Sequence, residues 1–547
     1  MKKPLLHELT LREKIGQTCV MRLDYPKGDP NFFKNNPYGG LWAAHLFLTE
    51  SNTEFVLGND VGLSNTDLSY PKKLDLWIKE CNKNLKVPLF GALDAESGAG
   101  PYVPGLSITI EPSAIGSAND EKLAFNIGKT VADEVLSAGC NWIWGPVADN
   151  ACMFSGVMTL RTFSNDVDLC SRMVKSQLSG IQSAGVAATA KHFPGADRHE
   201  YRDPHTQPSE ISYSMEEWQE YQGNIFQAAI DAGVYTVMVG HSSFPAADDT
   251  KVSGNYLPAT LSYKIITELL KEKMGFDGVV VTDGVNMRGL TMFYTGKELY
   301  AHLLLAGNDV ILGPEIDYLD AVEEAVHEGL LPESRIDDAC QRVLDLKEKL
   351  GLFDDDYTCG GGITEELLSA TQNASREIAR KGLSLISNEG NLLPLDPKKI
   401  KRVTIIYDGY SEGAYNNLKY MAEEFEKHGA KATYRKSITS AEDMKSISDN
   451  SDVIVYASYI GCHTPPGLPA FYGEKVAPFQ WVLTEGQEKS VGVSLGYPFM
   501  YYNYYTTCPV FVNTYSSSRA SVEEFVKGLY GDFELSTFSP FPIKPEM

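Results

Sequence analysis

Eight short apolar segments in the first 315 residues constrain the fold more than any other feature of this chain. They are QTCVMRL from residue 17, HLFLT from 45, PLFGALD from 88, NWIWGPV from 141, AATAKHF from 187, TVMVGHS from 236, GVVVTDG from 278 and DVILG from 309. Such runs are typical of parallel strands buried on both faces. Segments with apolar residues three and four apart lie between them, for example over 121–139, 166–185 and 261–275, and predict helices. Eight strands alternating with helices predict a (β/α)8 barrel.

A second pattern of alternating strands and helices follows the barrel. The run DDDYTCGGG from 354 indicates a linker, and a helix is expected over 366–382. Strands such as RVTIIYDG and DVIVYAS then alternate with amphipathic helices such as YNNLKYMAEEFEKHG, which favours a smaller, doubly wound α/β sandwich. We expect the barrel over 1–353, the linker and connecting helix over 354–385, and the sandwich over 386–547.

Composition excludes several classes of partner. The formal net charge of −24 would repel phosphate backbones and anionic lipids, which argues against nucleic acid or a membrane as the main partner. The amino terminus, MKKPLLHEL, lacks the apolar core of a secretion signal, and no apolar run reaches the roughly 18 residues that span a bilayer. We therefore expect a cytoplasmic protein whose partner is a small molecule.

The nine cysteines are scattered, without a Cys-x-x-Cys pair. This spacing argues against a zinc site and against a disulfide framework, and most of the thiols are expected to be buried. No metal and no other cofactor is expected.

Polar residues end several of the predicted strands: Asp94, Lys191 and His192, His241, and Asp283. Active sites of barrel enzymes are built at the carboxyl ends of the strands. A single polar residue there would carry little weight, but four strands that end in this way predict a site.

The loop over residues 191–208, KHFPGADRHEYRDPHTQP, is dense in chargeable side chains. Within it Asp203 and His205 flank Pro204, whose fixed φ limits how the pair is presented. A carboxylate beside an imidazole sets its tautomer and raises its basicity, as proton transfer near neutral pH requires. Asp283, next to Gly284 at the tip of an apolar strand, could face the barrel axis as a nucleophile or cap a helix.

Taken together, these motifs resemble glycoside hydrolase family 3, on the branch of the β-N-acetylhexosaminidases. The matching residues are Thr10 to Gln17, Arg161-Thr162-Phe163, Val186 to Gly195 with Asp203 and His205, Pro258 to Ser262, and Gly275 to Asp283 with Met287. The resemblance covers residues 8–352 and is looser through the second domain.

The resemblance implies a retaining, exo-acting glycosidase that removes β-linked N-acetylhexosamine from non-reducing ends, with N-acetylglucosamine as the expected sugar. It implies Asp283 as the nucleophile and His205, paired with Asp203, as the general acid/base. Sugar hydroxyls would be bound by Asp94, Arg161, Lys191 and His192, and His241 would line the same pocket.

Three departures from the family pattern affect the site. The stretch between Lys191 and Asp203 is a residue longer than usual, and Asp197 stands where glycine is common, which leaves open a different docking of the loop. The segment DAESGAG lacks the usual Gly-Gly pair and the Arg that follows it, and this puts the distal subsite in doubt. Asp283-Gly284 replaces the common Asp-Asp or Asp-Ala.

Other functions stay open. A β-glucosidase of the same family is one alternative, although its acid/base is usually a Glu of the second domain. A phosphorylase is another, because an imidazole does not repel an incoming phosphate. A non-catalytic sugar-binding homologue is disfavoured, since Asp203, His205 and Asp283 are all present. The second domain is open to three roles, which are to shape the pocket, to mediate a homodimer or to stabilise the barrel.

Two enzyme classes on barrels fit less well. A metal-dependent hydrolase would need a His-x-His motif on the first strand, and QTCVMRL contains no histidine. A Schiff-base aldolase that used Lys191 would leave the Asp203–His205 pair without a role.

Overall fold

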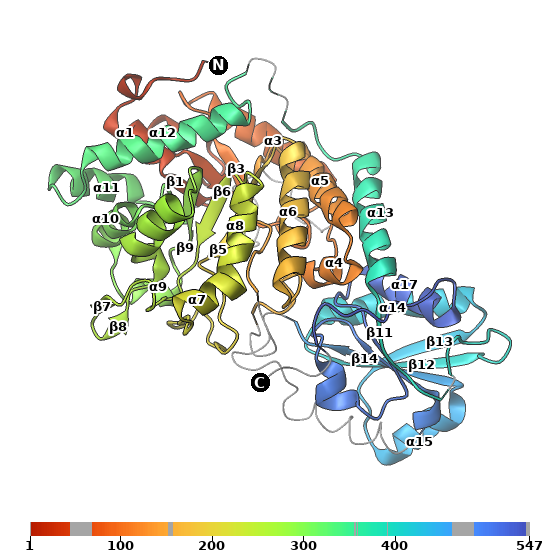
Figure 1. Ribbon diagram of the computed structural model, residues 1–547. Coiled ribbons are helices and arrows are strands. Elements are labelled where there is room, and N and C mark those ends of the chain that lie inside the picture. The colour runs from red at the N-terminus through yellow and green to blue at the C-terminus, as the bar shows by residue number, and fades with distance from the viewer. Residues whose placement is uncertain are drawn as a thin grey trace. The chain divides into compact units, whose positions relative to one another are not determined.

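The chain divides into two compact units (Figure 1). The computed structural model describes residues 2–43, 68–150, 157–354, 357, 359–390, 392–461 and 486–542. The first unit comprises Met1–Ile108, Ala124–Asp149 and Val174–Thr371, and the second comprises Thr109–Leu123, Asn150–Met173 and Gln372–Met547. We propose that the barrel domain ends at residue 353 and the sandwich begins at 386, and limited proteolysis between these positions tests the two limits.

The first unit contains a closed barrel of eight parallel strands, which confirms the predicted (β/α)8 architecture. In order around the barrel the strands are β1 (Cys19–Arg22), β2 (Gly40–Trp42), β3 (Phe90–Leu93), β4 (Trp142–Ile143), β5 (Ala187–Phe193), β6 (Thr236–Val239), β9 (Val279–Gly284) and β10 (Val310–Leu312). The last strand pairs with the first in parallel, which closes the sheet.

The second barrel strand lies earlier than the apolar pattern predicted. Strand β2 pairs with both β1 and β3, whereas the predicted segment HLFLT lies outside the described residues. Strand β2 begins with Gly40, where an added Cβ would come within 2.9 Å of the Val20 side chain and 3.2 Å of Phe90 Cβ. This close packing requires glycine at the first position of the strand. The sequence of β2 therefore lacks the longer apolar run that marked the other strands.

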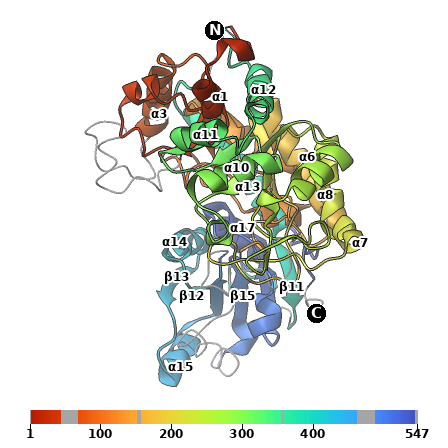
Figure 2. The same cartoon turned by 90° about the vertical axis from the view of Figure 1, so that its left-hand side faces the viewer.

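Helices surround the barrel strands (Figures 1 and 2). The α-helices of this region are α1 (Leu11–Gln17), α3 (Ser69–Asn82), α5 (Glu121–Ser137), α6 (Val167–Ser183), α7 (Met215–Trp218), α8 (Asn224–Asp231), α9 (Arg288–Thr291), α10 (Gly296–Ala306), α11 (Tyr318–His327) and α12 (Glu333–Lys349). Two π-helices are η4 (Gln219–Gly223) and η6 (Lys264–Lys273). Three 3-10 helices are η1 (Leu6–Glu8), η2 (Pro30–Lys34) and η5 (Ala259–Leu261), and β7 (Lys251–Val252) and β8 (Asn255–Tyr256) form a hairpin.

Local sequence signals set several of these helix ends. A capping box formed by Thr10 and Glu13 begins α1, because each side chain accepts a hydrogen bond from the other residue's backbone N–H. Gly307 ends α10 in the left-handed region at φ 118°, a conformation that glycine adopts without a steric cost. The helices therefore begin and end where their capping residues stand.

The barrel interior is packed with side chains rather than open. Phe90 and Trp142 meet edge to face at 5.0 Å, and Trp142 and Trp144 at 6.3 Å. The indole N–H of Trp142 donates to the hydroxyl of Thr189 at 2.9 Å, and this hydroxyl pairs with that of Thr236 at 2.7 Å. Buried polar groups in this core are thus hydrogen-bonded to one another.

The second unit contains a six-stranded sheet in the order β11-β16-β15-β14-β12-β13, four strands of which are labelled in Figure 2. The strands are β11 (Ser384–Asn388), β12 (Arg402–Gly409), β13 (Lys431–Lys436), β14 (Val453–Tyr459), β15 (Ser490–Ser494) and β16 (Val510–Asn513). All pairings are parallel except that of the edge strand β11 with β16. The helices that accompany the sheet are α4 (Pro112–Ala118), α13 (Glu365–Gly382), α14 (Glu412–Lys427), α15 (Ala441–Asn450), η8 (Gln487–Lys489), η9 (Tyr501–Tyr505) and α17 (Arg519–Tyr530). This arrangement confirms the predicted α/β sandwich.

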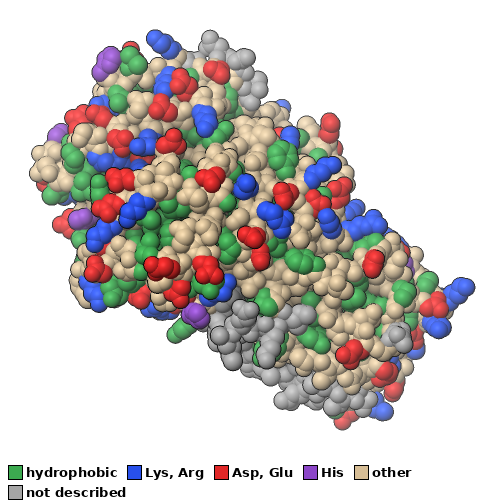
Figure 3. Space-filling view, viewed as in Figure 1, with side chains coloured by type: hydrophobic (Ala, Val, Ile, Leu, Met, Phe, Trp, Pro, Cys, Tyr) green, Lys and Arg blue, Asp and Glu red, His purple; other side chains and the backbone are tan. Residues whose placement is uncertain are grey.

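Other sequence-based expectations concern the surface and the thiols. The seven cysteines within the described ranges are buried and free. Among the same residues no helix has both the length and the apolar character needed to cross a membrane. Figure 3 shows Asp and Glu side chains scattered among Lys and Arg over the face in view.

Candidate active site

Asp283 lies at the carboxyl end of β9, as the sequence predicted. Its Oδ1 accepts a hydrogen bond from the Gly284 N–H at 2.7 Å, and its Oδ2 lies 4.0 Å from Nε2 of His192. Burial raises the pKa of Asp283, but His192, His241 and the Gly284 N–H outweigh burial, and the pKa lies below its usual range. The carboxylate is therefore ionised at neutral pH, as a nucleophile requires.

Lys191 joins two carboxylates at the end of β5. Its ammonium lies 2.6 Å from Oδ1 of Asp94 and 2.6 Å from Oε1 of Glu96, and its side chain is only 2% exposed. Asp94 and Glu96 follow β3, two strands away. The structure thus brings Lys191 and Asp94 together as the sequence suggested, and adds Glu96, which strand ends alone did not indicate.

His192 is oriented by a buried aspartate that sequence reasoning missed. Its Nδ1 lies 2.8 Å from Oδ2 of Asp149, and its backbone N–H donates to the same oxygen at 3.1 Å. Because a carboxylate accepts hydrogen bonds, Nδ1 of His192 carries a proton, and Nε2 is the nitrogen that faces Asp283. Asp149 lies six residues after β4 ends at Ile143, so only the polar pair Asp149-Asn150 in NWIWGPVADN could have indicated it.

Asp203 and His205 form the predicted pair. Nδ1 of His205 lies 2.6 Å from Oδ1 of Asp203, and the His205 backbone N–H donates to the same oxygen at 2.9 Å. The loop that carries them is bound to the segment after β9, since the Arg288 N–H donates to the His205 carbonyl at 3.2 Å and the Gly289 N–H to the Pro204 carbonyl at 3.1 Å. The loop that carries the acid/base candidate is therefore hydrogen-bonded to the segment that follows the nucleophile candidate.

Asp197, which departs from the family pattern, organises this loop from inside. Its side chain is 1% exposed. Its Oδ1 accepts from the His199 N–H at 2.7 Å, and its Oδ2 accepts from the backbone N–H and the hydroxyl of Ser212 at 2.6 Å each. A carboxylate with three donors stabilises the longer loop.

His241 is buried after β6, and protein atoms bind both of its ring nitrogens. Nε2 donates to the Gly284 carbonyl at 3.0 Å, and Nδ1 lies 2.9 Å from the hydroxyl of Thr260. Burial lowers the pKa of His241 despite the nearby Asp283. The predicted pocket-lining histidine is therefore a neutral ring that contacts the residue after the nucleophile.

Arg161 belongs to the second unit. Within that unit its guanidinium lies 3.6 Å from the Met158 sulfur. Its assignment as a sugar ligand stays a prediction.

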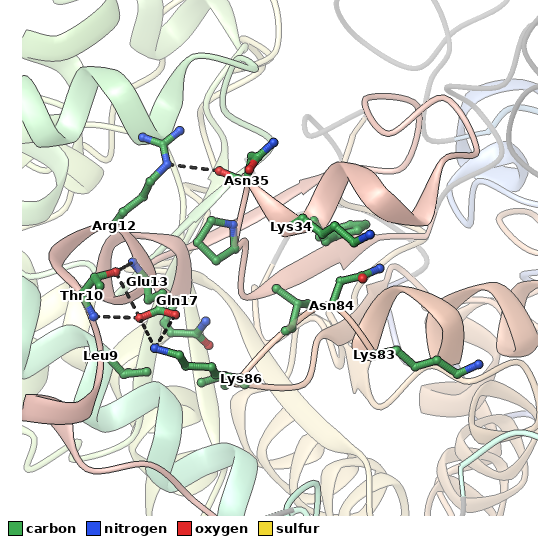
Figure 4. Close-up of a pocket in the computed structure, with 14 residues that line it drawn as sticks. Leu9, Thr10, Arg12, Glu13, Gln17, Lys34, Asn35, Lys83, Asn84 and Lys86 are labelled. Carbon is green, nitrogen blue, oxygen red and sulfur yellow. Dashed lines mark hydrogen bonds and ion pairs between the residues drawn. The ribbon is translucent and has the colours of Figure 1, made fainter.

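A pocket lies at the opposite, amino-terminal end of the barrel strands (Figure 4). It measures about 850 Å³ and is lined by residues that precede β1, β2 and β3. Carboxylates of the chain pair with its cations, for example Glu13 with Lys86 at 2.9 Å and Glu323 with Arg12 at 2.7 Å. Because these charges are already neutralised and the candidate catalytic groups lie at the other end, the end of the barrel that carries Asp283 is the candidate active site.

Metal chemistry has no ready ligand set in the part of the chain that the structure describes. Within those ranges no group of three or more His, Cys, Asp or Glu side chains is arranged to hold a metal ion. The ionisable groups described above around Asp283 and Lys191 are carboxylates, imidazoles and the buried ammonium of Lys191.

Several known proteins are similar to this chain in sequence. The chain is 30% identical over 339 residues to a β-N-acetylglucosaminidase/β-glucosidase of Cellulomonas fimi, covering 60% of this chain and 59% of the relative. It is 27% identical over 380 residues to β-hexosaminidase A of Pseudoalteromonas piscicida, covering 62% of each chain. The chain thus spans about three fifths of the length of these relatives.

Solved structures share the whole fold. A β-glucoside phosphorylase, BglX, bound to 2FGlc superimposes with a TM-score of 0.82 at 23% identity, covering 98% of this chain and 95% of that one. A β-N-acetylglucosaminidase from Paenibacillus sp. str. FPU-7 gives 0.81 at 24% identity, covering 98% and 100%. The model of the glycosyl hydrolase family 3 N-terminal domain matches residues 10–346. Because this match spans more than half of the chain, the protein belongs to glycosyl hydrolase family 3.

Proposed function

We propose that this protein is a retaining, exo-acting glycoside hydrolase that removes β-linked N-acetylhexosamine, with N-acetylglucosamine as the sugar. The observation that carries the proposal is an ionised Asp283 at the end of β9, where the segment that follows it is hydrogen-bonded to the loop of the Asp203–His205 pair. A nucleophilic carboxylate and a proton-transfer group are the two components that a retaining mechanism needs.

In the first step Asp283 attacks the anomeric carbon through Oδ2, because Oδ1 is held by the Gly284 N–H. The bond from the anomeric carbon to the leaving oxygen breaks as His205 donates a proton to that oxygen. Asp203 binds Nδ1 of His205 at 2.6 Å, so that Nε2 faces the reaction and the imidazolium is stabilised. The product is a glycosyl ester of Asp283.

In the second step the ester is hydrolysed. His205, now neutral, takes a proton from water, and the water oxygen attacks the anomeric carbon. The bond to Asp283 breaks, the carboxylate returns, and the sugar leaves with its original configuration. The exposure of the His205 side chain, 43%, fits a group that must meet both a leaving group and water.

We expect sugar hydroxyls to bind the polar side chains around Lys191 and His192. Asp94 and Glu96 are held beside Lys191, and paired carboxylates can accept from neighbouring hydroxyls while the ammonium donates to their oxygens. Nε2 of His192 lies near Asp283 and can contact a hydroxyl beside the reacting carbon. Such contacts orient the ring for in-line attack.

The choice of N-acetylhexosamine rests on the Asp-x-His pair and on relatives. The two relatives described above carry β-N-acetylglucosaminidase and β-hexosaminidase in their names, and one of them is also named a β-glucosidase. A β-glucosidase is therefore the second candidate.

The first test measures nitrophenol release from the nitrophenyl β-N-acetylglucosaminide and β-glucoside in parallel, each with and without inorganic phosphate. We expect faster release from the N-acetyl substrate and free sugar as the product. Preference for the glucoside would overturn the sugar assignment. A sugar phosphate formed only with phosphate would make the protein a phosphorylase, and no turnover of either substrate would contradict the proposed activity.

A further inference from the structure

Both ring nitrogens of His241 are hydrogen-bonded within the protein. It is 2% exposed, and each ring nitrogen already has a protein partner, Thr260 on one side and the Gly284 carbonyl on the other. A carbonyl oxygen can only accept, so Nε2 carries the proton and Nδ1 accepts from the Thr260 hydroxyl. Neither nitrogen is left for a hydroxyl of the substrate.

The partner of His241 is the residue that holds the nucleophile. Gly284 donates its N–H to Oδ1 of Asp283 at 2.7 Å and accepts from His241 through its carbonyl at 3.0 Å. Both backbone groups of this glycine are therefore used, one on each side of its Cα, and its carbonyl also accepts from the Met287 N–H at 3.2 Å.

Thr260, the other partner of His241, is also held by hydrogen bonds within the protein. The backbone carbonyl of Thr260 accepts from the side-chain amide of Asn308 at 2.9 Å, and the same amide donates to the Leu303 carbonyl at 2.6 Å. Thr260 lies in η5 and is itself fully buried. The path from Asn308 to Asp283 thus runs through buried hydrogen bonds, which resist small displacements.

We propose that His241 is a positioning residue, whose Nε2–H holds the Gly284 carbonyl so that the Gly284 N–H holds Oδ1 of Asp283 and Oδ2 alone faces the sugar. This inference rests on the proposed role of Asp283 as nucleophile. It replaces the pocket-lining role that the family resemblance implied for His241.

A neutral ring suits this task. The titratable groups that act on His241 are Asp283, which favours its protonation, and His192 and His205, which oppose it. Burial outweighs all three and lowers its pKa. A second proton would sit on Nδ1 and would remove the acceptor that binds the Thr260 hydroxyl.

The kinetic test compares His241→Gln, which keeps an N–H donor at the place of Nε2, with His241→Met, which keeps bulk and removes the donor. We expect His241→Met to lower kcat about 10²-fold, the loss expected when a reacting group is misplaced, and His241→Gln to lower it less than about 10-fold. The Ki of the free sugar should change less than about 3-fold in both variants, because no sugar contact is lost. His302→Met, at an exposed histidine stacked on Tyr294, is the matched control and should leave kcat unchanged.

The pH profile gives a readout that a general loss of stability would not change. The Gly284 N–H and the charge of protonated His241 both help to keep the pKa of Asp283 low. Both variants lose that charge and only His241→Met also loosens Gly284, so the acidic limb of kcat/KM should move to higher pH further in His241→Met than in His241→Gln. Equal kcat losses in the two variants with equal shifts of the acidic limb would overturn the proposal. So would a sugar Ki that rises in both.

A spectroscopic test separates this inference from the proposed function. With 15N-labelled histidine, the signal that disappears in His241→Gln should be that of a neutral ring with its proton on Nε2 at neutral pH, because burial lowers the pKa of His241. A ring protonated on both nitrogens, or on Nδ1 alone, would overturn the positioning role. This measurement needs no turnover, whereas unimpaired turnover by Asp283→Ala would overturn the nucleophile assignment itself.

Discussion

The two ends of the barrel both bury charged side chains, but they bury them differently. At the carboxyl end, Asp283 has one oxygen held by Gly284 and the other facing His192 across 4.0 Å. At the amino end, Asp309 is fully buried and is bound by Lys271 at 3.0 Å, by Arg335 at 2.7 Å and by the Val280 N–H at 2.9 Å. The first carboxylate keeps an oxygen for chemistry, and the second is saturated.

The buried lysines Lys347 and Lys191 differ between the two ends of the barrel in the same way. At the amino end its ammonium donates to the side-chain oxygen of Gln17 at 2.7 Å and to the Gly39 carbonyl at 2.8 Å, over the ring of Phe90. No carboxylate pairs with it in the described residues, and burial lowers its pKa to about 7. Lys191 instead pairs with two carboxylates. The difference indicates that the amino end serves stability and the carboxyl end serves function.

The largest expected effect is on rate, at the carboxyl end. Asp283→Ala should lower kcat by at least about 10⁴-fold, because the covalent step loses its nucleophile. The thermal midpoint should not fall, since a buried charge is removed with only one hydrogen bond. Steady-state kinetics and thermal unfolding on the same preparation measure the two effects. A variant with a lower thermal midpoint and an unchanged kcat would contradict the functional role assigned to the carboxyl end.

The next effect is on stability, at the amino end. Asp309→Asn leaves the cations Lys271 and Arg335 without their buried carboxylate, which should cost about 3–5 kcal/mol of unfolding free energy. Urea unfolding followed by circular dichroism measures the loss, and kcat of the folded fraction should be unchanged.

Asp338→Asn is the matched control. It removes the half-exposed partner of Arg335 at 2.9 Å and should cost less than about 1 kcal/mol. Equal losses of unfolding free energy in the two variants would mean that the burial of Asp309 does not make its ion pairs more important than the exposed pair of Asp338.

A smaller effect on rate is expected at His205. His205→Ala should slow substrates with poor leaving groups about 10²- to 10³-fold, because they need a proton, and nitrophenyl substrates much less. The comparison uses a methyl or sugar aglycone against nitrophenol. Equal slowing of both classes would assign His205 to orientation rather than to proton transfer.

The smallest effect is a pH dependence of stability from Lys347. Its folded pKa of about 7 lies below the value of about 10.4 for an unfolded lysine. Between these values the unfolded chain binds more protons, so the unfolding free energy contributed by Lys347 should rise with pH, by at most about 1.4 kcal/mol per pH unit. The difference in urea midpoints between the wild type and Lys347→Met, measured from pH 7 to 9, isolates this contribution. A constant difference would show that the lysine keeps its proton in the folded state.

Apolar runs and their spacing predicted the barrel and the sandwich, because burial of a strand on both faces leaves a direct mark on its residues. They failed at β2, where close packing requires Gly40 and the strand spans only Gly40–Trp42. The strand-end pattern also pointed to Asp94 and Lys191, which form an ion pair, and to His192 and Asp283, whose side chains lie 4.0 Å apart. It missed Asp149, because that residue stands in a loop beyond a two-residue strand.

The sequence by itself determined the two-part architecture, the family and the chemical types available at the strand ends, because periodicity and local motifs are properties of the chain alone. Only the tertiary structure decided which partner each group has. It paired Lys191 with Glu96 as well as Asp94, His192 with Asp149, and His241 with the Gly284 carbonyl. These choices depend on atoms that are far apart in sequence and meet within about 3 Å, a distance set by packing rather than by any local pattern.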